Sequence, residues 1–329
     1  MKIATLLKVL GCFAAILGVL FGMMLLLTRG TVTVADTVAG NPSLPVLSEA
    51  PVRLHGQIFG DDTAPLVIVL HGGPGGDHRS LLALNALSDR YRVLFYDQRG
   101  AGLSERVAAQ DLSVAHHLSD LDSLVRQYAN AEQVSLIGHS WGAMLAVAYM
   151  GAHPNTVANA VLIEPGFLEK SGYDDFETLR STVANSPRVL WAGLKAGFAA
   201  RNVLGDRHAQ HDHLIGSVVS AFANHPDTPY HCPDVAYSAP SWRFGGLASD
   251  TFWANPDPAL EAMRQGVGHP APILFLSGGC NDWTGTELQD NHARLFPNAR
   301  VATIQNAGHD VIWDQPEAAL QKIRHHLAQ

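Results

Sequence analysis

The residues with the clearest chemistry in this chain are Gly138–Gly142, which read glycine, histidine, serine, tryptophan, glycine. A serine flanked in this way is typical of a sharp turn from a strand into a helix, which exposes the hydroxyl as a nucleophile. The glycines are needed because the two backbones approach closely at such a turn. Residues 133–137 before it are strand-like, and residues 142–149 after it are small and apolar, with helical character. We therefore predict that Ser140 is a nucleophile for acyl transfer.

A glycine-rich loop upstream could complete the site for such a reaction. Residues 66–70 form an apolar, strand-like run that leads into His71–Gly76. Glycines in this loop let a backbone N–H approach a substrate carbonyl, and we predict that Gly73 and Trp141 supply the N–H groups of an oxyanion hole. The alternatives are a plain turn or a phosphate-binding loop. The phosphate loop is disfavoured because the Gly-Lys-Ser/Thr ending is missing.

The predicted general base is His309, in the loop between a strand at 300–304 and a helix at 316–327. Histidine is chosen because it exchanges protons readily near neutral pH. The chain holds 17 histidines, so it is the position after the last predicted strand that singles this one out.

A carboxylate should orient that histidine, and two residues are candidates. Asp282 follows the strand at 273–277 and gives the chain order serine, acid, histidine. A buried carboxylate there would hold the imidazole in its productive tautomer. Glu164, which ends the strand after the nucleophile helix, is the alternative, although a carboxylate in that place is commonly a loop cap. We predict Asp282 as the acid and keep Glu164 as the second choice.

The order of apolar runs and amphipathic stretches predicts the fold that positions these residues. It indicates an α/β class with a mostly parallel, eight-stranded sheet and helices on both faces. We expect residues 51–166 and 269–329 to form the core. The strand rhythm stops between them, so residues 167–268 are predicted to be a helical lid over the serine.

Composition limits the classes of function. A hydrophobic content of 47% with 16% charged residues suits a well-buried core, and a net charge of −8 argues against nucleic-acid binding. The lid histidines His208, His211 and His213 do not have the spacing of a known zinc motif, and no cysteine lies near them. We therefore predict no metal and no cofactor, and leave the oligomeric state open.

The N-terminus carries a candidate membrane segment, because residues 9–27 contain no charge and are long enough to cross a bilayer as a helix. Lys2 and Lys8 precede the segment, and Arg29 is the basic residue that closely follows it. This bias predicts a cytoplasmic N-terminus, with residues 1–29 as a single-pass anchor and the catalytic domain on the non-cytoplasmic side, periplasmic in a bacterium.

Residues 30–50 are predicted to be a linker between the anchor and the domain, because glycine, proline and small polar residues recur there. The stretch Thr37–Ala39 could act as a poor cleavage site, so a signal peptide and a secreted protein are the alternative. The uncleaved anchor is preferred because the apolar run is longer than the signal core of about 7–15 residues.

Cysteine usage leaves one question open. Cys12 lies in the apolar segment, Cys232 in the predicted lid and Cys280 near the acid loop. In an oxidising compartment, Cys232 and Cys280 could pair and hold the lid to the core. The default interpretation is two unpaired small hydrophobic residues.

Three motifs together resemble the α/β-hydrolase superfamily: His71–Gly76, Asp97–Ser104 and Gly138–Gly142. They are most similar to its proline iminopeptidase (prolyl aminopeptidase) branch, and the resemblance extends over residues 50–328. It implies that residues 97–100 form a structural turn beneath the active site. Two departures stand out. The family's acid position coincides with Asn281, one residue before Asp282, and the stretch at 164–166 differs from that branch.

The resemblance implies a serine hydrolase that cleaves an ester or amide of a small molecule or short peptide through an acyl-enzyme. The first candidate is an aminopeptidase of the proline iminopeptidase kind, in which lid carboxylates would bind the substrate amine. The carboxylates available for this are Asp174, Asp175, Glu177 and Glu164. The alternatives are a carboxylesterase or lactone hydrolase and, from another class, a non-catalytic ligand-binding protein on a hydrolase scaffold. Fold relatives with an aspartate nucleophile are disfavoured because Ser140 stands in that place.

Overall fold

The computed structural model describes residues 3–49, 51–226, 228, 230–232, 235–236 and 238–329. Its centre is an eight-stranded sheet with the order β10-β9-β7-β6-β4-β5-β3-β2. The strands are β2 Val46–Ser48, β3 Leu54–Phe59, β4 Leu66–Leu70, β5 Arg92–Tyr96, β6 Val134–His139, β7 Val157–Ile163, β9 Ile273–Gly278 and β10 Ala299–Ile304. Among these described strands, β3 pairs antiparallel with both β2 and β5, and the other neighbours pair in parallel. The predicted mostly parallel sheet is thus confirmed.

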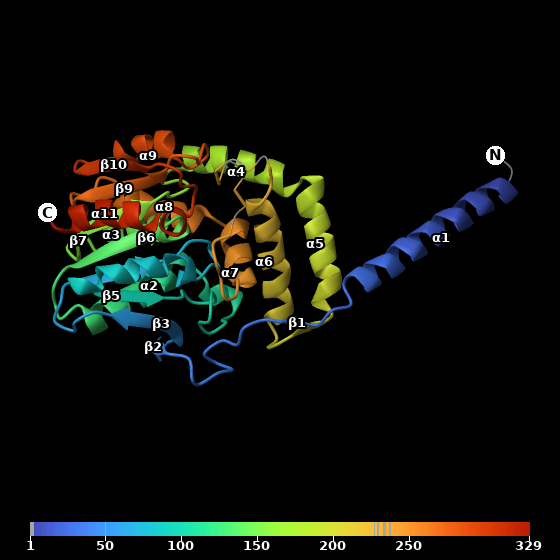
Figure 1. Ribbon diagram of the computed structural model, residues 1–329, viewed down its shortest axis with the longest axis horizontal. Coiled ribbons are helices and arrows are strands. Elements are labelled where there is room, and N and C mark those ends of the chain that lie inside the picture. The colour runs from blue at the N-terminus through green and yellow to red at the C-terminus, as the bar shows by residue number, and fades with distance from the viewer. Residues whose placement is uncertain (1–2, 50, 227, 229, 233–234, 237) are drawn as a thin grey trace.

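The sheet is buried on both faces because alternate residues of its strands are apolar on both sides. In β4, Ile68 and Leu70 contribute to one core, and Val67 and Val69 to the other. The first core lies under α2 (Val114–Tyr128) and α3 (Trp141–Ala152), and the second under a 3₁₀ helix (His78–Asp89), α10 (Val311–Asp314) and α11 (Pro316–Leu327). Figure 1 shows the helices that cover the sheet. A further core helix, α9 (Thr286–Ala293), lies between β9 and β10 in the chain.

The predicted lid is a stack of helices at one end of the sheet (Figure 1). It consists of α4 (Lys170–Ala184), α5 (Pro187–Ala200), α6 (Ala209–Ala223) and α7 (Gly246–Ala254). The segment that follows differs from the prediction, because α8 (Asp257–Gly266) packs on α3 and belongs to the core. A Cβ at Gly266 would lie 1.8 Å from the carbonyl oxygen of Val147, so α3 and α8 meet backbone to backbone at this glycine.

The N-terminal helix α1 (Ile3–Leu27) extends away from the rest of the molecule (Figure 1). Its window Leu10–Leu27 has a mean hydropathy of 2.5 and is 6% buried. By length and composition this helix could cross a membrane, and a signal sequence near an N-terminus would show the same features. Lys2, which the topology prediction used, lies outside the described residues.

The predicted linker is partly built into the fold rather than a free tether. Within it, β1 (Val32–Thr33) pairs in parallel with β8 (Val203–Leu204) of the lid. Val38 is buried, and its N–H donates to the carbonyl oxygen of Leu103 at 2.8 Å. Strand β2 then adds to the edge of the main sheet. The apolar valines among the small polar residues account for this ordering.

A disulfide joins Cys232 to Cys280, across 48 residues of sequence. The default interpretation from the sequence, two unpaired thiols, was therefore wrong. Cys280 directly precedes Asn281, so the bond ties the segment after α6 to the loop that follows β9. Cys12 is the free cysteine of the chain and lies exposed on α1.

Candidate active site

Ser140 lies at the junction of β6 and α3, in the turn that its flanking glycines predict. Its φ of 52° and ψ of −118° are a conformation that non-glycine residues rarely adopt, and such strain is concentrated at functional sites. A Cβ at Gly138 would lie 2.4 Å from the carbonyl oxygen of Gly142. A Cβ at Gly142 would lie 2.2 Å from the carbonyl oxygen of Leu70, and both distances are too short for a side chain. The glycines are therefore required for strand and helix to approach, and the turn leaves Ser140 partly exposed.

The loop His71–Gly76 lies against the serine, as expected for an oxyanion loop. A Cβ built on Gly72 would lie 3.1 Å from the Cβ of Ser140. Gly73 has a φ of 131°, a backbone conformation that strongly favours glycine. The loop therefore follows a path beside Ser140 that side chains at these positions would disturb.

A glutamine that the sequence did not single out as functional connects this loop to the nucleophile helix. The Gln98 side chain donates to the carbonyl oxygen of His71 at 2.9 Å and accepts from the indole N–H of Trp141 at 2.8 Å. Its backbone N–H donates to Nε2 of His71 at 2.9 Å, and burial lowers the pKa of that imidazole, which keeps it neutral. Gln98 thereby holds together the two segments that carry the predicted oxyanion donors.

His309 is placed at the same end of the sheet by the loop after β10. Its Nδ1 lies 2.7 Å from Oε2 of Glu164 and 3.1 Å from the hydroxyl of Thr284. The backbone is held on both sides: the N–H donates to the carbonyl oxygen of Tyr230 at 2.6 Å, and Nε2 of His139 donates to the His309 carbonyl oxygen at 2.9 Å. Burial lowers the pKa of His309 to about 4. With its proton on Nδ1, the neutral ring has a free Nε2 lone pair.

Glu164 ends β7 with a φ of 47° and is fully buried. Burial raises its pKa, and hydrogen bonds from surrounding donors oppose that rise. The Gly278 N–H donates to Oε1 at 2.7 Å, while the Asn281 amide and the Thr284 hydroxyl donate to Oε2. Together with Nδ1–H of His309, these donors match an ionised carboxylate, because a protonated carboxyl would need an acceptor of its own.

The structure brings Glu164, and not Asp282, to the histidine. Asp282 is exposed, whereas its neighbour Asn281 is buried and points inward to Glu164. The Asn281 side-chain oxygen accepts from the N–H groups of Trp283 and Thr284, which closes the loop around it. With Asn281 turned inward, Asp282 is turned out to solvent. The preference for Asp282 as the acid is therefore corrected in favour of Glu164.

Ser140 and His309 line one cavity of about 910 Å³ beneath the lid, together with Gly73 and Trp141. Several lid aromatics also face it: Phe176, Phe222, Tyr230, Phe244, Phe252 and Trp253. Of these, Phe176, Phe252 and Trp253 also pack on the core. These three residues therefore line the cavity and also hold the lid to the core.

Most acidic side chains near the cavity already have partners. Asp77 accepts from Ser241 and Trp242, Asp212 accepts from Arg243, and Asp250 pairs with His211. The exception is Asp310, a buried cavity residue beside His309. No hydrogen bond or ion pair to its carboxylate is found among the residues that the structure describes.

The lid carboxylates considered as amine ligands do not line this cavity. Asp174 pairs with Lys170 and Glu177 with Arg180, both along α4, while Asp175 is exposed. Glu164 is engaged by His309, as described above. The acidic residues of α4 thus belong to a solvated helix face rather than to the cavity.

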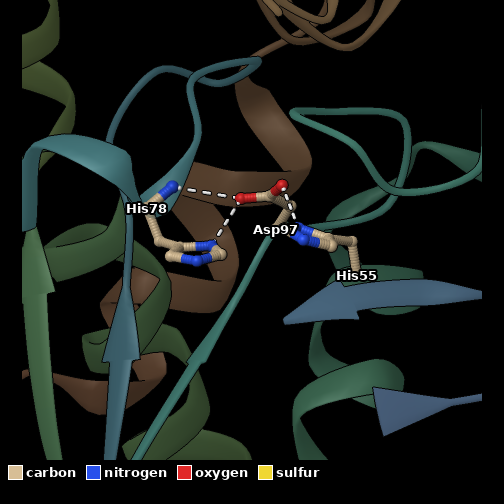
Figure 2. A group of neighbouring side chains, drawn as sticks. All are labelled: His55, His78 and Asp97. Carbon is tan, nitrogen blue, oxygen red and sulfur yellow. Dashed lines mark hydrogen bonds and ion pairs between the residues drawn. The ribbon is translucent and has the colours of Figure 1, made fainter. Parts of the chain in front are cut away.

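A group of two histidines and an aspartate lies at the base of the lid and has the residue types of a metal site (Figure 2). One carboxylate oxygen of Asp97 accepts a hydrogen bond from Nδ1 of His55 at 2.8 Å, and the other accepts one from Nδ1 of His78 at 2.7 Å. The backbone N–H groups of His78 and Leu103 donate to the same carboxylate. These separations are those of direct hydrogen bonds, and Asp97 already has four donors, so the group fits a structural network better than a metal.

We expect Asp97→Asn to destabilise the protein by about 3–5 kcal/mol, because it removes the charge of a buried carboxylate that accepts from four donors. Thermal unfolding of the purified protein measures this. Incubation with a strong chelator should leave the wild-type Tm unchanged, and the exposed Asp282→Asn is the matched control. A chelator-induced drop in Tm would contradict the structural interpretation.

The lid histidines are not gathered into a ligand set. His211 binds Asp250 at 2.8 Å, and His208 accepts from Arg207. Among the described residues, the grouping with metal-ligand chemistry is the one at Asp97.

This combination of fold and site agrees with a sequence comparison. The profile for the alpha/beta hydrolase fold matches residues 65–316, so the chain belongs to this family. Within the family it is similar to proteins named proline iminopeptidase, as the sequence motifs indicated.

Three relatives illustrate the extent of the similarity. Proline iminopeptidase PfmaB of Pestalotiopsis fici is 27% identical over 279 residues, covering 82% of this chain and 94% of that protein. The proline iminopeptidase of Heyndrickxia coagulans is 40% identical over 99 residues, which cover 30% of this chain and 34% of its own length. A third, the mouse sn-1-specific diacylglycerol lipase ABHD11, is 27% identical over 82% of this chain and 83% of that protein.

Solved structures agree on the fold. The proline iminopeptidase-related protein TTHA1809 of Thermus thermophilus superposes with a TM-score of 0.60 at 22% identity, covering 87% of this chain and 97% of that one. Est816, an N-acyl homoserine lactone degrading enzyme, has a TM-score of 0.58 at 18% identity, covering 85% of this chain and 99% of that one. At such low identity these likenesses establish the architecture alone.

Proposed function

We propose that this alpha/beta hydrolase is a serine hydrolase in which Ser140, His309 and Glu164 form the catalytic triad. The observation that carries the proposal is the 2.7 Å contact between Nδ1 of His309 and Glu164. Because Nδ1 is engaged by Glu164, the neutral imidazole keeps a free lone pair on Nε2, and His309 lines the same cavity as Ser140. The strained turn at Ser140 supports the same role.

In this mechanism Ser140 attacks an ester or amide carbonyl while His309 takes its proton. The oxyanion is bound by the backbone N–H groups of Trp141 and Gly73. His309 then protonates the leaving group, and water releases the acyl group by the same route. Glu164 orients the ring and stabilises the imidazolium without accepting the proton itself.

An aminopeptidase is the first candidate for the substrate class. Relatives named proline iminopeptidase support it. Asp310, at the cavity wall beside His309, supports it as well, because its carboxylate has no hydrogen bond or ion pair within the described part of the chain. An ammonium group of a short peptide would pair with this carboxylate while the first peptide bond lies at Ser140.

A carboxylesterase or lactone hydrolase is the second candidate, because much of the lid side of the cavity is apolar. Helix α6 contributes Ile215, Val218 and Val219 to that wall. Such a surface suits an acyl chain without a charge.

A substrate panel with an Asp310→Asn variant separates these candidates. For the aminopeptidase we expect hydrolysis of prolyl or small aminoacyl p-nitroanilides, with kcat/KM lowered about tenfold or more in Asp310→Asn because a charge-assisted contact is lost. Short p-nitrophenyl esters should be cleaved equally well by both proteins. Asp282→Asn is the matched control. Turnover restricted to neutral esters would move the assignment to the second candidate.

We also propose that α1 is an uncleaved anchor, with the hydrolase domain on the non-cytoplasmic side. The charge-free window Leu10–Leu27 and the basic residue Lys8 before it support this orientation. Intact mass of the protein extracted from membranes, together with protease accessibility on sealed vesicles, tests the proposal. A chain that starts after residue 30 would indicate a cleaved signal peptide instead.

A further inference from the structure

The outer face of lid helix α5 is unusually apolar for a surface that faces solvent. Leu190 is 59% exposed, and Trp191 and Leu194 are each 49% exposed. Their spacing places them on one side of the helix, whereas Val189 and Ala196 on the other side are buried. Because α5 packs against α6, Leu190, Trp191 and Leu194 on its outer side are left without cover.

This exposed face continues into the end of α1. The rings of Phe198 on α5 and Phe21 on α1 lie edge to face, 5.5 Å apart. Arg201, just after α5, donates to the carbonyl oxygen of Leu25 at 2.9 Å and to the hydroxyl of Thr28 at 2.8 Å. The end of α1 nearest the domain is therefore held against the end of α5, and Figure 1 shows α1 leaving the body at this point.

The charges on α5 also fit a lipid surface. The helix contains no acidic residue, and its two basic residues, Arg188 and Lys195, are exposed. An amphipathic helix with tryptophan and leucine on one face and basic residues beside it is typical of the membrane interface. Tryptophan is enriched at that depth, and basic side chains are attracted to anionic headgroups.

We propose that α5 is an interfacial helix that docks on the same bilayer that α1 crosses, through Leu190, Trp191 and Leu194. The proposal rests on the anchoring of α1 proposed above. The opposite side of α5 contributes Val189 to the wall of the catalytic cavity. The lid over Ser140 therefore contacts the lipid, and α5 is the helix that separates the cavity from the acyl chains.

Tryptophan quenching by brominated lipids tests this docking in the full chain. No tryptophan lies in α1, so quenching by bromine in the upper acyl chains reports on the hydrolase domain alone. In vesicles of phosphatidylcholine with anionic phosphatidylglycerol, we expect part of the wild-type emission to be quenched. Trp191→Phe should remove that part. Trp313→Phe, which changes a tryptophan 44% exposed in α10, should retain it.

A second variant guards against a folding artefact. Leu190→Gln with Leu194→Gln keeps every tryptophan, and we expect it to lose most of the quenching while its hydrolysis of a short soluble substrate is unchanged. Equal quenching in wild type and Trp191→Phe, or none in wild type, would overturn the docking. Flotation of the vesicles reports anchoring separately: a protein that floats but is not quenched refutes the role of α5 while leaving α1 as an anchor.

Discussion

Ser140→Ala is expected to lower kcat by about four to six orders of magnitude, as removal of a triad serine does in other serine hydrolases. The hydroxyl is the atom that forms the acyl-enzyme, so neither His309 nor the oxyanion donors can replace it. The fold should persist, because the side chain of Ser140 makes no described hydrogen bond and alanine is smaller. Steady-state turnover and Tm, measured on the same preparation, check both parts.

Fluorophosphonate labelling gives an independent readout of the same residue. The wild-type protein should be modified at Ser140, and Ser140→Ala should not be modified. Ser80→Ala is the matched control, since Ser80 lines the same cavity. Wild-type turnover in Ser140→Ala would refute the proposed nucleophile. A wild-type protein that neither turns over the panel nor reacts with the probe would favour a non-catalytic binding protein.

Glu164→Gln should lower kcat by about 10³–10⁴-fold with little change in KM, as loss of the triad carboxylate does elsewhere. Glutamine keeps the shape of the side chain but has no charge to stabilise the imidazolium that forms during attack. Its amide also offers a donor to Nδ1, which favours the wrong tautomer of His309. Asp282→Asn should leave kcat within about twofold of wild type, because exposed substitutions away from a site have small effects.

The pair of variants decides the acid directly. Stability must be measured alongside kcat, because Glu164 also accepts from Gly278 and Asn281 and its replacement affects that buried network. A folded Glu164→Gln protein with normal turnover would exclude the residue as the acid. A large loss of kcat in Asp282→Asn would return the role to Asp282.

The parts of the site that depend on local backbone chemistry could be predicted from the sequence. The turn at Ser140 follows from two glycines between a strand and a helix, and the loop at residues 71–76 from its glycine content. The positions of the buried strands along the chain follow from the same local patterns, since runs such as residues 66–70 are apolar at every position.

The parts of the site that depend on the direction of a side chain in space could not be predicted from the sequence. Asn281 and Asp282 are neighbours, and only the path of the loop turns one inward and the other out. The bonds of Gln98 to His71 and Trp141 join three separate segments. Helix α8 was assigned to the lid because the strand rhythm stops over residues 167–268, and this local pattern does not show that the helix packs on α3.

The covalent link between Cys232 and Cys280 has a consequence for how the protein matures. Such bonds form after a chain leaves the reducing cytosol. If α1 exports the domain, the newly made chain crosses the bilayer with both thiols free. Asn281, directly after Cys280, donates to Glu164. The disulfide therefore restrains the loop that holds Glu164 only after export. A copy retained in the cytosol would therefore lack this bond beside Glu164, although it shares every amino acid with the exported form.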